Sequence, residues 1–407
     1  MDVIELRKQF PQLEEKVYGK SLVYLDNAAT SLRPSSVIDH WTRSASFKTA
    51  NLHRAVHHIA AEATEDYENA RSFVASCLNA ESPDEIVFTS GATAALNLVA
   101  FCFGEAFISE GDEIIIAQSE HHSDIVPWQM LCRRKASKIK VWEVDEQGHL
   151  SLEQLETLIT ERTKIVCVAH ISNVLGLVNP IKEIANICHS RNCVLLCDGA
   201  QGMVHQRVDV RELGCDFYLF SGHKLYAAPG TGVLYGRREL LEQMPPYMGG
   251  GEMIETVKWS GSTYAPLPRK YEAGTQNISG TPTLSDALAL AREMDTPEIN
   301  ANLLEIRDFV LNKLLSDPRI RLYGLPGDGV EKIPLFSFSV EHCHHEDLAL
   351  ILDKMGVAVR SGQMCAEPLM DRFGVTGMLR ASFAPYNTME EAEYFIESLN
   401  KAIKMLG

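Results

Sequence analysis

The sequence predicts an α/β protein with two domains: a large domain built on a mostly parallel sheet, and a small α+β domain after it. Two observations support this. Short apolar runs alternate with helical patterns through most of the chain, and the pattern changes in the last third. A chain of 407 residues, 45% of them hydrophobic, is also long enough to bury the cores of one larger and one smaller domain.

The sheet of the large domain is predicted from seven short β-rich runs. They lie at 85–89, 113–117, 139–144, 164–170, 193–198, 217–221 and 232–236. Apolar runs of this kind are typical of strands covered on both faces. Helices lie between several of them. The helix after Ser151 has Gln154 in the capping-box position and apolar residues at 152, 155, 158 and 159 on one face.

The small domain is predicted from a different arrangement of elements. Strands are expected at 333–341, 357–362 and 379–386, with a helix over 344–356 between the first two. A final helix begins after Thr388, which forms a capping box with Glu391. We place the domain boundary near residue 260, so that residues 21–260 form the large domain and 261–407 the small one. The first 20 residues are expected to pack on the small domain.

The composition narrows the class of protein and its partners. A formal charge of −16 argues against nonspecific binding to nucleic acid or to an anionic membrane. The ten cysteines are scattered rather than arranged as a dense disulfide framework, so most should be reduced thiols. Neither a secretory leader nor a membrane-spanning run is expected. We therefore expect a cytoplasmic protein whose partners are small molecules or other proteins.

The segment FYLFSGHKLY, residues 217–226, introduces the first candidate for chemistry. Its strand stops at Ser221, and the turn that follows places Lys224 at the edge where α/β sheets bind ligands. Most lysines are simply solvated surface residues. The alternative is a Schiff-base lysine, which requires a lowered amine pKa and a carbonyl cofactor such as pyridoxal phosphate.

Three other predicted strand ends favour the Schiff-base alternative. Asp198 ends one strand, where a carboxylate could pair with a pyridinium nitrogen. Ala92 and Thr93 lie where another strand turns into a helix, and free backbone N–H groups at a helix start can bind phosphate. His121 follows a third strand and could stack on a pyridine ring. Each residue alone is commonly structural, but their order along one sheet edge predicts a cofactor site.

The segments in this order resemble the class V aminotransferase superfamily, which has the fold type I of pyridoxal-phosphate-dependent transferases. Within it they are most similar to the group II cysteine desulfurases of the SufS and CsdA type. The resemblance runs nearly end to end, through YLDNAATSLRP (24–34), NLHRAVH (51–57), EHHSDIVPWQ (120–129), HISNVLG (170–176), DGAQG (198–202), SGHKLY (221–226), GGGEMI (249–254), EAGTQN (272–277), RSGQMCAEP (360–368) and LRASFAPYNT (379–388).

The resemblance implies a role for each matching residue. Lys224 would bind pyridoxal 5'-phosphate as a Schiff base and move the Cα proton of the substrate. The other cofactor contacts implied are Asp198 to the ring nitrogen, Gln201 to the phenolic oxygen, His121 to the ring face, and Ala92, Thr93, Ser221, His223 and Thr275 around the phosphate. Arg380, with Asn173 and Arg360, would bind the substrate carboxylate. Because the resemblance places Thr275 in the neighbouring subunit's site, it also implies a homodimer.

Cys365 lies in a loop, whereas free cysteines are usually buried. In the family the matching cysteine attacks the sulfur of L-cysteine, keeps it as a persulfide and leaves L-alanine. A reachable thiolate beside Arg360 suits that role. The short segment around Cys365 resembles group II members, whose compact loops go with a sulfur-acceptor protein of the SufE or CsdE type. The resemblance thus implies that the sulfur is delivered through this acceptor to iron–sulfur cluster assembly or to another pathway.

The sequence departs from the family pattern at several positions. Met364 replaces the histidine that commonly precedes the nucleophile, which removes a local proton acceptor. Ala94 stands where Glu is frequent, and YAAPGTG (226–232) brings Ala227 and Ala228 into a loop that is usually rich in glycine. Asp124 and Gln276 replace a common Asn and Pro. The lysine, the acid, the arginine and the nucleophile are all retained.

The cluster EHCHHED at 341–347 could suggest a metal site. It falls where a strand passes into a helix, however, and lacks the ligand spacing of structural zinc sites, so we expect no metal there.

Two alternatives to the cysteine desulfurase remain open. The same cofactor could support selenocysteine lyase or cysteine sulfinate desulfinase chemistry, which does not need attack by Cys365. The departures at Met364, Ala94 and Ala227 could instead have left a sulfur-relay scaffold of low activity. The acceptor protein, the pathway, the preference among the three substrates and the effect of the departures on the rate are not determined by the sequence.

Overall fold

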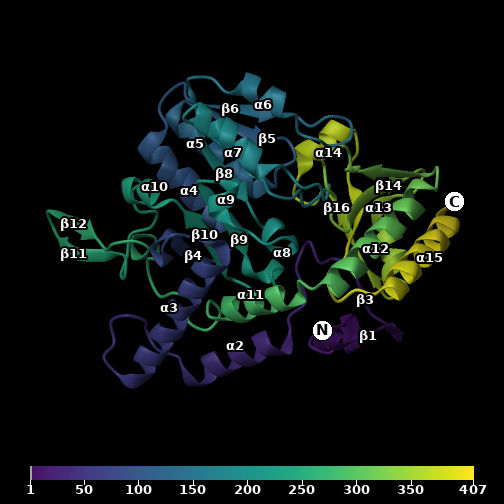
Figure 1. Cartoon of the computed structure of the whole chain (residues 1–407), viewed down its shortest axis with the longest axis horizontal. Helices are drawn as coiled ribbons and strands as arrows, with labels where there is room; N and C mark the ends of the chain where they lie inside the picture. Colours follow the sequence, from purple (N-terminus) through teal and green to yellow (C-terminus); the bar gives the residue numbers. More distant parts are fainter. Residues whose placement is uncertain (1) are drawn as a thin grey trace.

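The computed structural model describes residues 2–407, and Met1, the first residue of the predicted N-terminal segment, lies outside the described residues. A seven-stranded sheet forms the centre of the large domain (Figure 1). Its strands are, in spatial order, β4 (Ile86–Thr89), β10 (Gly232–Gly236), β9 (Phe217–Ser221), β8 (Val194–Asp198), β7 (Thr163–Ala169), β5 (Glu113–Ala117) and β6 (Lys138–Trp142). Only β10 runs antiparallel to its neighbours in this sheet. The predicted mostly parallel seven-stranded sheet is therefore confirmed.

Both faces of the sheet are buried, as its continuous apolar strands require. Val166 and Cys167, neighbours on β7, belong to separate core clusters on opposite sides of the sheet. One cluster is covered by α4 (Ala92–Phe107) and α5 (Val126–Lys135), and the other includes residues of α3 (His58–Leu78) and α7 (Ile181–Ser190). The remaining elements around the sheet are α2 (Ser35–Phe47), α6 (Leu152–Leu158), α8 (Gly202–His205), α9 (Val210–Leu213) and α10 (Arg238–Gln243).

The small domain has a four-stranded antiparallel sheet, in the order β13 (Ile320–Tyr323), β14 (Leu335–Val340), β17 (Met378–Ser382) and β16 (Arg360–Gly362). Its helices are α12 (Pro297–Leu315), α13 (His345–Lys354), α14 (Glu367–Phe373) and α15 (Met389–Leu406). Thr388 and Glu391 form the predicted capping box of α15. The single strand expected at 357–362 is divided, because β15 (Val357–Ala358) pairs in parallel with β3 (Val23–Tyr24) before the chain enters the sheet as β16.

Contacts at both ends of the chain bear on the domain limits. In α1 (Val3–Arg7), Arg7 pairs with Glu391 of α15 at 2.8 Å, while Phe10 is buried against Tyr226 of the large domain. The helix α11 (Thr283–Met294) packs on α2 and α3, whereas α12 packs on α15. The predicted limits of 1–20, 21–260 and 261–407 stay a prediction, and these contacts favour a boundary between α11 and α12.

A β hairpin of β11 (Ile254–Lys258) and β12 (Gly261–Tyr264) projects from the large domain (Figure 1). A shorter hairpin, β1 (Lys16–Val17) with β2 (Lys20–Ser21), lies near the N-terminus. Within residues 2–407, no helix combines the length and the apolar character needed to span a bilayer.

Candidate active site

The carboxyl ends of β4, β5, β8 and β9 meet at one edge of the large sheet, where α/β folds bind ligands. A cavity of about 210 Å³ lies at this edge and is also walled by residues of the small domain. Twelve of the thirteen residues predicted from the sequence line it: Ala92, Thr93, His121, Asn173, Asp198, Gln201, Ser221, His223, Lys224, Arg360, Cys365 and Arg380. Thr275 does not line it.

Lys224 lies in a short turn directly after β9 and is half-buried. Burial lowers the pKa of the amine, and the nearby Asp198 carboxylate opposes this shift. A lysine whose pKa is lowered by burial keeps more of its neutral amine, the form that attacks a carbonyl carbon. The position therefore suits a Schiff-base lysine.

Asp198 ends β8 and is 7% exposed. Burial raises the pKa of its carboxyl, while Lys224 and the N–H of Ala200, which donates to Asp198 Oδ1 at 2.8 Å, lower it. Gln201, 2% exposed, donates its side-chain amide to the carbonyl of Ala28 at 2.8 Å. A buried carboxylate in this place would be satisfied by a cationic ring nitrogen.

The start of α4 forms a cradle at the same edge. The Ala92 N–H donates to Ser221 Oγ at 2.8 Å, and the Thr93 and Ser123 hydroxyls are 2.8 Å apart. Gly232 is needed for this close approach, because a Cβ there would lie 2.4 Å from Gly91 Cα. A further hollow of about 340 Å³ opens over the start of the helix. Backbone N–H groups and hydroxyls at a helix start are a ready site for a phosphate.

Two histidines of the cavity carry neutral rings. Burial, with smaller contributions from Lys224, His122 and Arg380, lowers the pKa of His121 to about 4. Its Nδ1 accepts the N–H of Ser123 at 3.1 Å, so the proton of the neutral ring is on Nε2. Burial and Lys224 lower the pKa of His223 to about 4 as well. Neutral imidazoles beside the lysine add no charge that would repel a cationic cofactor ring.

Arg380 of β17 brings a guanidinium from the small domain into the cavity. Its Nη1 donates to the carbonyl of Asn173 at 2.8 Å, and its Nη2 lies 3.4 Å from Asp26 Oδ1. Burial lowers the pKa of Arg380 to about 10. Its Nε is buried without a partner among the described residues. A buried donor in this state is costly, so it indicates a missing acceptor such as a substrate carboxylate.

Cys365 is the exposed cysteine of the chain, because the other nine, all within the described residues, are buried or half-buried. Met364 and Cys365 both have left-handed backbone conformations, with φ of 53° and 57°. Such strain persists only where the surroundings hold it. The Asn173 amide donates to the Met364 carbonyl at 2.9 Å, and the His122 N–H donates to the Cys365 carbonyl at 2.7 Å.

The turn of Cys365 is fixed on its other side too. The Nε2 of His122 accepts the N–H of Glu367 at 2.9 Å, at the start of α14. The Met364 side chain, 5% exposed, packs in an apolar cluster with Leu175 and Leu369. The sequence suggested that Met364 takes the place of a proton acceptor, and the structure gives its side chain a packing role next to Cys365 in the chain.

Thr275 lies outside the cavity of its own chain, on an exposed loop. Glu272 fixes the start of this loop. Its carboxylate accepts two N–H groups of the buried Arg71, at 2.7 and 2.9 Å, and the N–H of Phe88 at 2.7 Å. The loop is thus tied to α3 and β4.

Two buried acids behind Asp198 were not singled out as site residues from the sequence. Glu120 and Asp124 are each 0% exposed, and Glu120 Oε2 and Asp124 Oδ2 have no hydrogen-bond partner among the described residues. Burial raises the pKa of both well above the usual range, and neighbouring carboxylates add to the effect. Glu120 follows the end of β5 directly before His121, which is the sequence signal that could have found it.

The cluster at 341–347 was considered as a metal site. His344 caps α13 by accepting the Glu346 N–H at 3.3 Å. Among residues 2–407 there is no group of three or more His, Cys, Asp or Glu side chains placed to hold a metal ion.

Comparisons with known proteins agree with the site. The aminotransferase class-V family matches residues 23–395. A probable cysteine desulfurase of Vibrio cholerae serotype O1 is 42% identical over 401 residues, covering 98% of each chain. A cysteine desulfurase of Escherichia coli O6:H1 is 41% identical over 406 residues, covering 100% of this chain and 99% of its own.

Solved structures of cysteine desulfurases are also similar to this chain. The crystal structure of the cysteine desulfurase CsdA from Escherichia coli, in its S-sulfonic acid form, superposes with a TM-score of 0.92 at 37% identity, covering 100% of both chains. The apo cysteine desulfurase of Thermococcus onnurineus NA1 gives 0.93 at 34% identity, covering 100% of this chain and 99% of its own.

The class V aminotransferases and cysteine desulfurases depend on pyridoxal phosphate. The residues present fit this cofactor: a lysine amine, a buried carboxylate and a phosphate cradle at the start of α4, which Gly232 allows to lie close to β10. The sequence expectations of fold, cofactor and activity are thereby confirmed. With this site and these relatives, the chain belongs to the class V aminotransferase family and, within it, to the pyridoxal-phosphate-dependent cysteine desulfurases.

Proposed function

We propose that this protein converts L-cysteine to L-alanine and receives the sulfur on Cys365 as a persulfide. One juxtaposition supports the proposal: the Lys224 amine, the Arg380 guanidinium and the exposed thiol line the same small cavity. The amine and the guanidinium suit the amino and carboxyl ends of an amino acid, and the thiol suits its sulfur.

The residues divide the work as follows. Pyridoxal phosphate, when bound, supplies an electron sink for charge at the substrate Cα. Arg380 binds the substrate carboxylate and thereby satisfies its free Nε. Lys224 removes the Cα proton and later returns a proton, a role that needs the lowered amine pKa that burial gives it. Asp198 would hold the cofactor ring nitrogen, and neutral His121 would cover the ring.

The sulfur step is a nucleophilic attack by the Cys365 thiolate on the substrate sulfur. A sulfur–sulfur bond forms while the carbon–sulfur bond of the substrate breaks. The electron pair of that bond stays with the substrate β-carbon, which takes up a proton and leaves as part of alanine. The clamp of His122 and Asn173 on the turn keeps the thiol at the cavity during the attack.

The first test is to incubate the pyridoxal-phosphate-loaded protein with L-cysteine, weigh the Cys365 peptide by mass spectrometry and assay alanine. We expect one added sulfur on that peptide and formation of alanine. Lys224→Ala should abolish both, because a catalytic base is worth at least about 100-fold in rate. Cys365→Ser should abolish the adduct, with cofactor absorbance as the control for a folded site.

Other outcomes would favour the alternatives. Alanine formed from selenocysteine or cysteine sulfinate by Cys365→Ser, at the rate of the unmodified protein, would indicate lyase or desulfinase chemistry as the main activity. No alanine from any of the three substrates would contradict the proposal and support the relay scaffold.

We further propose that the protein is a homodimer in which Thr275 completes the phosphate site of the partner subunit. Exposed large apolar side chains on the large domain support a subunit interface. Val56 and Trp259 are fully exposed, and Phe47 at the end of α2 is 73% exposed. The hairpin that carries Trp259 stands out from the body of the chain (Figure 1). Association of two subunits would remove apolar side chains such as these from water.

We propose that the persulfide sulfur passes to an acceptor protein of the SufE or CsdE type. The exposure of Cys365 in a held, compact turn supports this, because the acceptor has to reach the thiol where it stands. The cytoplasm is the proposed compartment, and the ten free thiols support it. Persulfide formed on Cys365 should disappear when a purified acceptor of this type is added, and persistence of the adduct would contradict transfer.

A further inference from the structure

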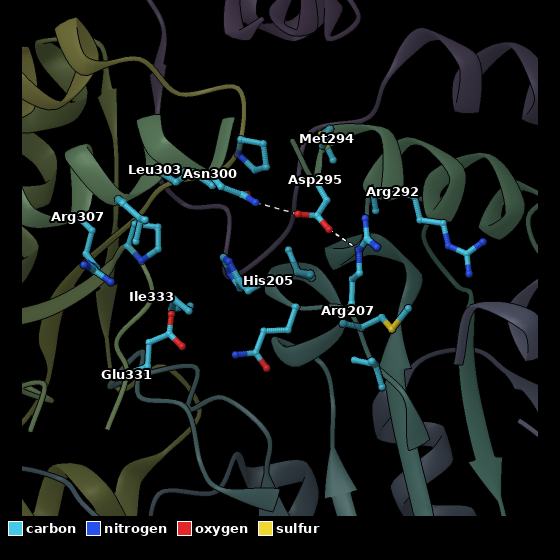
Figure 2. Close-up of a pocket in the computed structure, with 18 of the residues that line it drawn as sticks. His205, Arg207, Arg292, Met294, Asp295, Asn300, Leu303, Arg307, Glu331 and Ile333 are labelled. Atoms are coloured by element: carbon cyan, nitrogen blue, oxygen red, sulfur yellow. Dashed lines mark hydrogen bonds and ion pairs between the residues drawn. The ribbon is translucent and has the colours of Figure 1, made fainter. Parts of the chain in front are cut away.

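A second cavity, of about 650 Å³, lies away from the candidate active site. Its walls come from α8 and the segment after it, from α11, from α12 and from the segment 331–334, so both domains contribute. Figure 2 shows its lining side chains arranged around an open centre. The volume falls in the range of small-molecule sites. None of the thirteen predicted site residues lines this cavity, and nothing in the proposed reaction uses it.

Much of the cavity wall is apolar. Met203 of α8, Leu288 and Met294 of α11, Leu303 of α12 and Ile333 all contribute to the lining. Met203, Leu288, Met294 and Ile333 are buried, so this wall belongs to the packed body of the protein. It offers a favourable surface to an apolar ligand body.

The polar lining carries more positive than negative charge. Arg207, Arg292, Arg307 and Lys332 line the cavity together with two acids, Asp295 and Glu331. The Lys332 amine already donates to the Leu175 carbonyl. Asp295 is already used, because it pairs with Arg207 and accepts the Asn300 amide at 2.8 Å (Figure 2). Arg292 donates to the Ser76 carbonyl.

Arg307 keeps free donors beside the cavity. Its Nε donates to Asp308 and its Nη1 donates to the Lys332 carbonyl at 3.5 Å, while its Nη2 makes no hydrogen bond or ion pair within residues 2–407. The side chain is only 23% exposed. A guanidinium in this state favours an anionic partner.

His205 adds a neutral polar group. Burial lowers its pKa to about 4, so the imidazole is uncharged at neutral pH and presents one donor and one acceptor. It makes no hydrogen bond or ion pair in the described part of the chain. In Figure 2 it lies between the Arg207 and Asp295 pair on one side and Arg307 and Glu331 on the other. A ligand group that accepts a hydrogen bond could therefore be held in the centre of the cavity.

We propose that this cavity binds a small organic carboxylate with an apolar body. The body would lie on the apolar wall, and the carboxylate would accept hydrogen bonds from Arg307 and His205. A polyphosphate fits poorly, because its several charges would need a glycine-rich cradle or several free cations, and the lining offers neither. The binding site does not depend on the proposed function.

The cavity wall is also tied to the candidate active site. Residues 331–333 pair with the loop 176–178, through Ile333 N–H to the Gly176 carbonyl and Val178 N–H to the Glu331 carbonyl, both at 2.9 Å. The same loop begins at Asn173, which contacts Arg380 and the turn of Cys365. A bound ligand that braces this wall is expected to change the KM for L-cysteine.

The test is isothermal titration calorimetry of the pyridoxal-phosphate-loaded protein with sodium octanoate, and with octanol as the uncharged probe. We expect one octanoate per chain, with an affinity that is roughly millimolar or tighter for a ligand of this size. Arg307→Gln and Ala291→Met, which fills the cavity from α11, should each weaken binding about tenfold or more. The matched controls, Arg319→Gln on the surface and Ala289→Met on the same helix but outside the lining, should bind as the unmodified protein does.

Unchanged thermal midpoints and cofactor absorbance will show that the variants are folded. If either Arg307→Gln or Ala291→Met fails to fold, the other still tests the site. The proposal fails if octanoate shows no saturable binding, if octanol binds equally well, or if Arg307→Gln and Ala291→Met bind like their controls. A KM for L-cysteine that is unchanged by saturating octanoate would overturn the link to the active site.

Discussion

Asp124 is a buried acid at a position where the resemblance of the sequence implies asparagine. It is fully buried with Glu120 and close to Asp198, and its Oδ1 accepts the indole N–H of Trp128 at 3.0 Å. Three carboxyls have only the Lys224 amine and the ring nitrogen of the cofactor to balance their charge. Because an unpaired buried charge is very costly, Asp124 is expected to stay protonated and to act as a neutral side chain, as the asparagine implied by the resemblance would be.

This gives a prediction about stability and pH. Burial raises the pKa of Asp124 in the folded state, so the folded protein keeps a proton that the unfolded chain loses above about pH 4. The free energy of unfolding therefore falls as the pH rises toward the folded-state pKa. Asp124→Asn should remove this loss, so the variant should be stabilised relative to the unmodified protein more at pH 8 than at pH 5.

Urea unfolding at the two pH values measures this difference. Asp328→Asn, on an exposed loop, is the matched control and should change stability equally little at both. An effect of Asp124→Asn that is the same at pH 5 and pH 8 would mean that the folded protein does not hold a proton on Asp124 that the unfolded chain has lost.

At the scale of the element, the turn of Cys365 combines local strain with packing. Two successive left-handed residues place the thiol outward while the Met364 side chain enters the core. Neither hydrogen bond of the clamp involves the thiol itself. The turn is therefore held by its backbone and by Met364, which leaves Cys365 free to react.

Met364→Ala should loosen this turn. Removing a buried methionine side chain costs about 2–5 kcal/mol in a well-packed core, and part of that cost falls on the conformation of the turn. We expect slower persulfide formation on Cys365 with normal cofactor absorbance, measured by rapid quenching and mass spectrometry. Met364→Leu conserves the apolar volume and should react nearly as the unmodified protein does. If Met364→Ala forms the persulfide as fast as Met364→Leu does, packing of the Met364 side chain does not hold the turn.

The elements also show which parts of the structure can be predicted from a sequence. Lys224, Asp198 and His121 each follow an apolar run, so the order of the runs was enough to place them at one sheet edge. The division of 357–362 into two strands depends on β3, a pair of residues more than 300 positions earlier, and no local pattern contains that information. The buried contacts of Glu120 and Asp124 likewise arise only from packing.

At the scale of the whole molecule, Thr275 lies outside the cavity of its own chain, so in the proposed dimer it would serve the site of the partner subunit. Its loop is fixed to α3 and β4 by the buried pair of Glu272 and Arg71, so it is presented as a rigid surface feature. In the proposed dimer each phosphate site takes its Thr275 from the other chain.

Mixed dimers test this directly. Chains carrying Lys224→Ala are combined with chains carrying Thr275→Val, each of which should have low activity alone. If Thr275 acts in the partner's site, the mixed dimer contains one site with both Lys224 and Thr275, and activity should return to roughly half that of the unmodified dimer per active-site pair. Native mass spectrometry checks that the mixed dimers have formed. If they form but show no recovery of activity, Thr275 acts in the site of its own chain or in neither site.

The distribution of cysteines has a practical consequence for chemical labelling. One thiol of the ten is exposed. Burial raises the pKa of other cysteines, that of Cys102 to about 12, so they hold little of the reactive thiolate at neutral pH. A maleimide dye applied to the native protein at neutral pH should therefore attach mainly at Cys365, with no need to remove the other cysteines. The natural sequence thus already contains a single-site reporter, whose fluorescence would follow the arrival of a partner at the reactive turn.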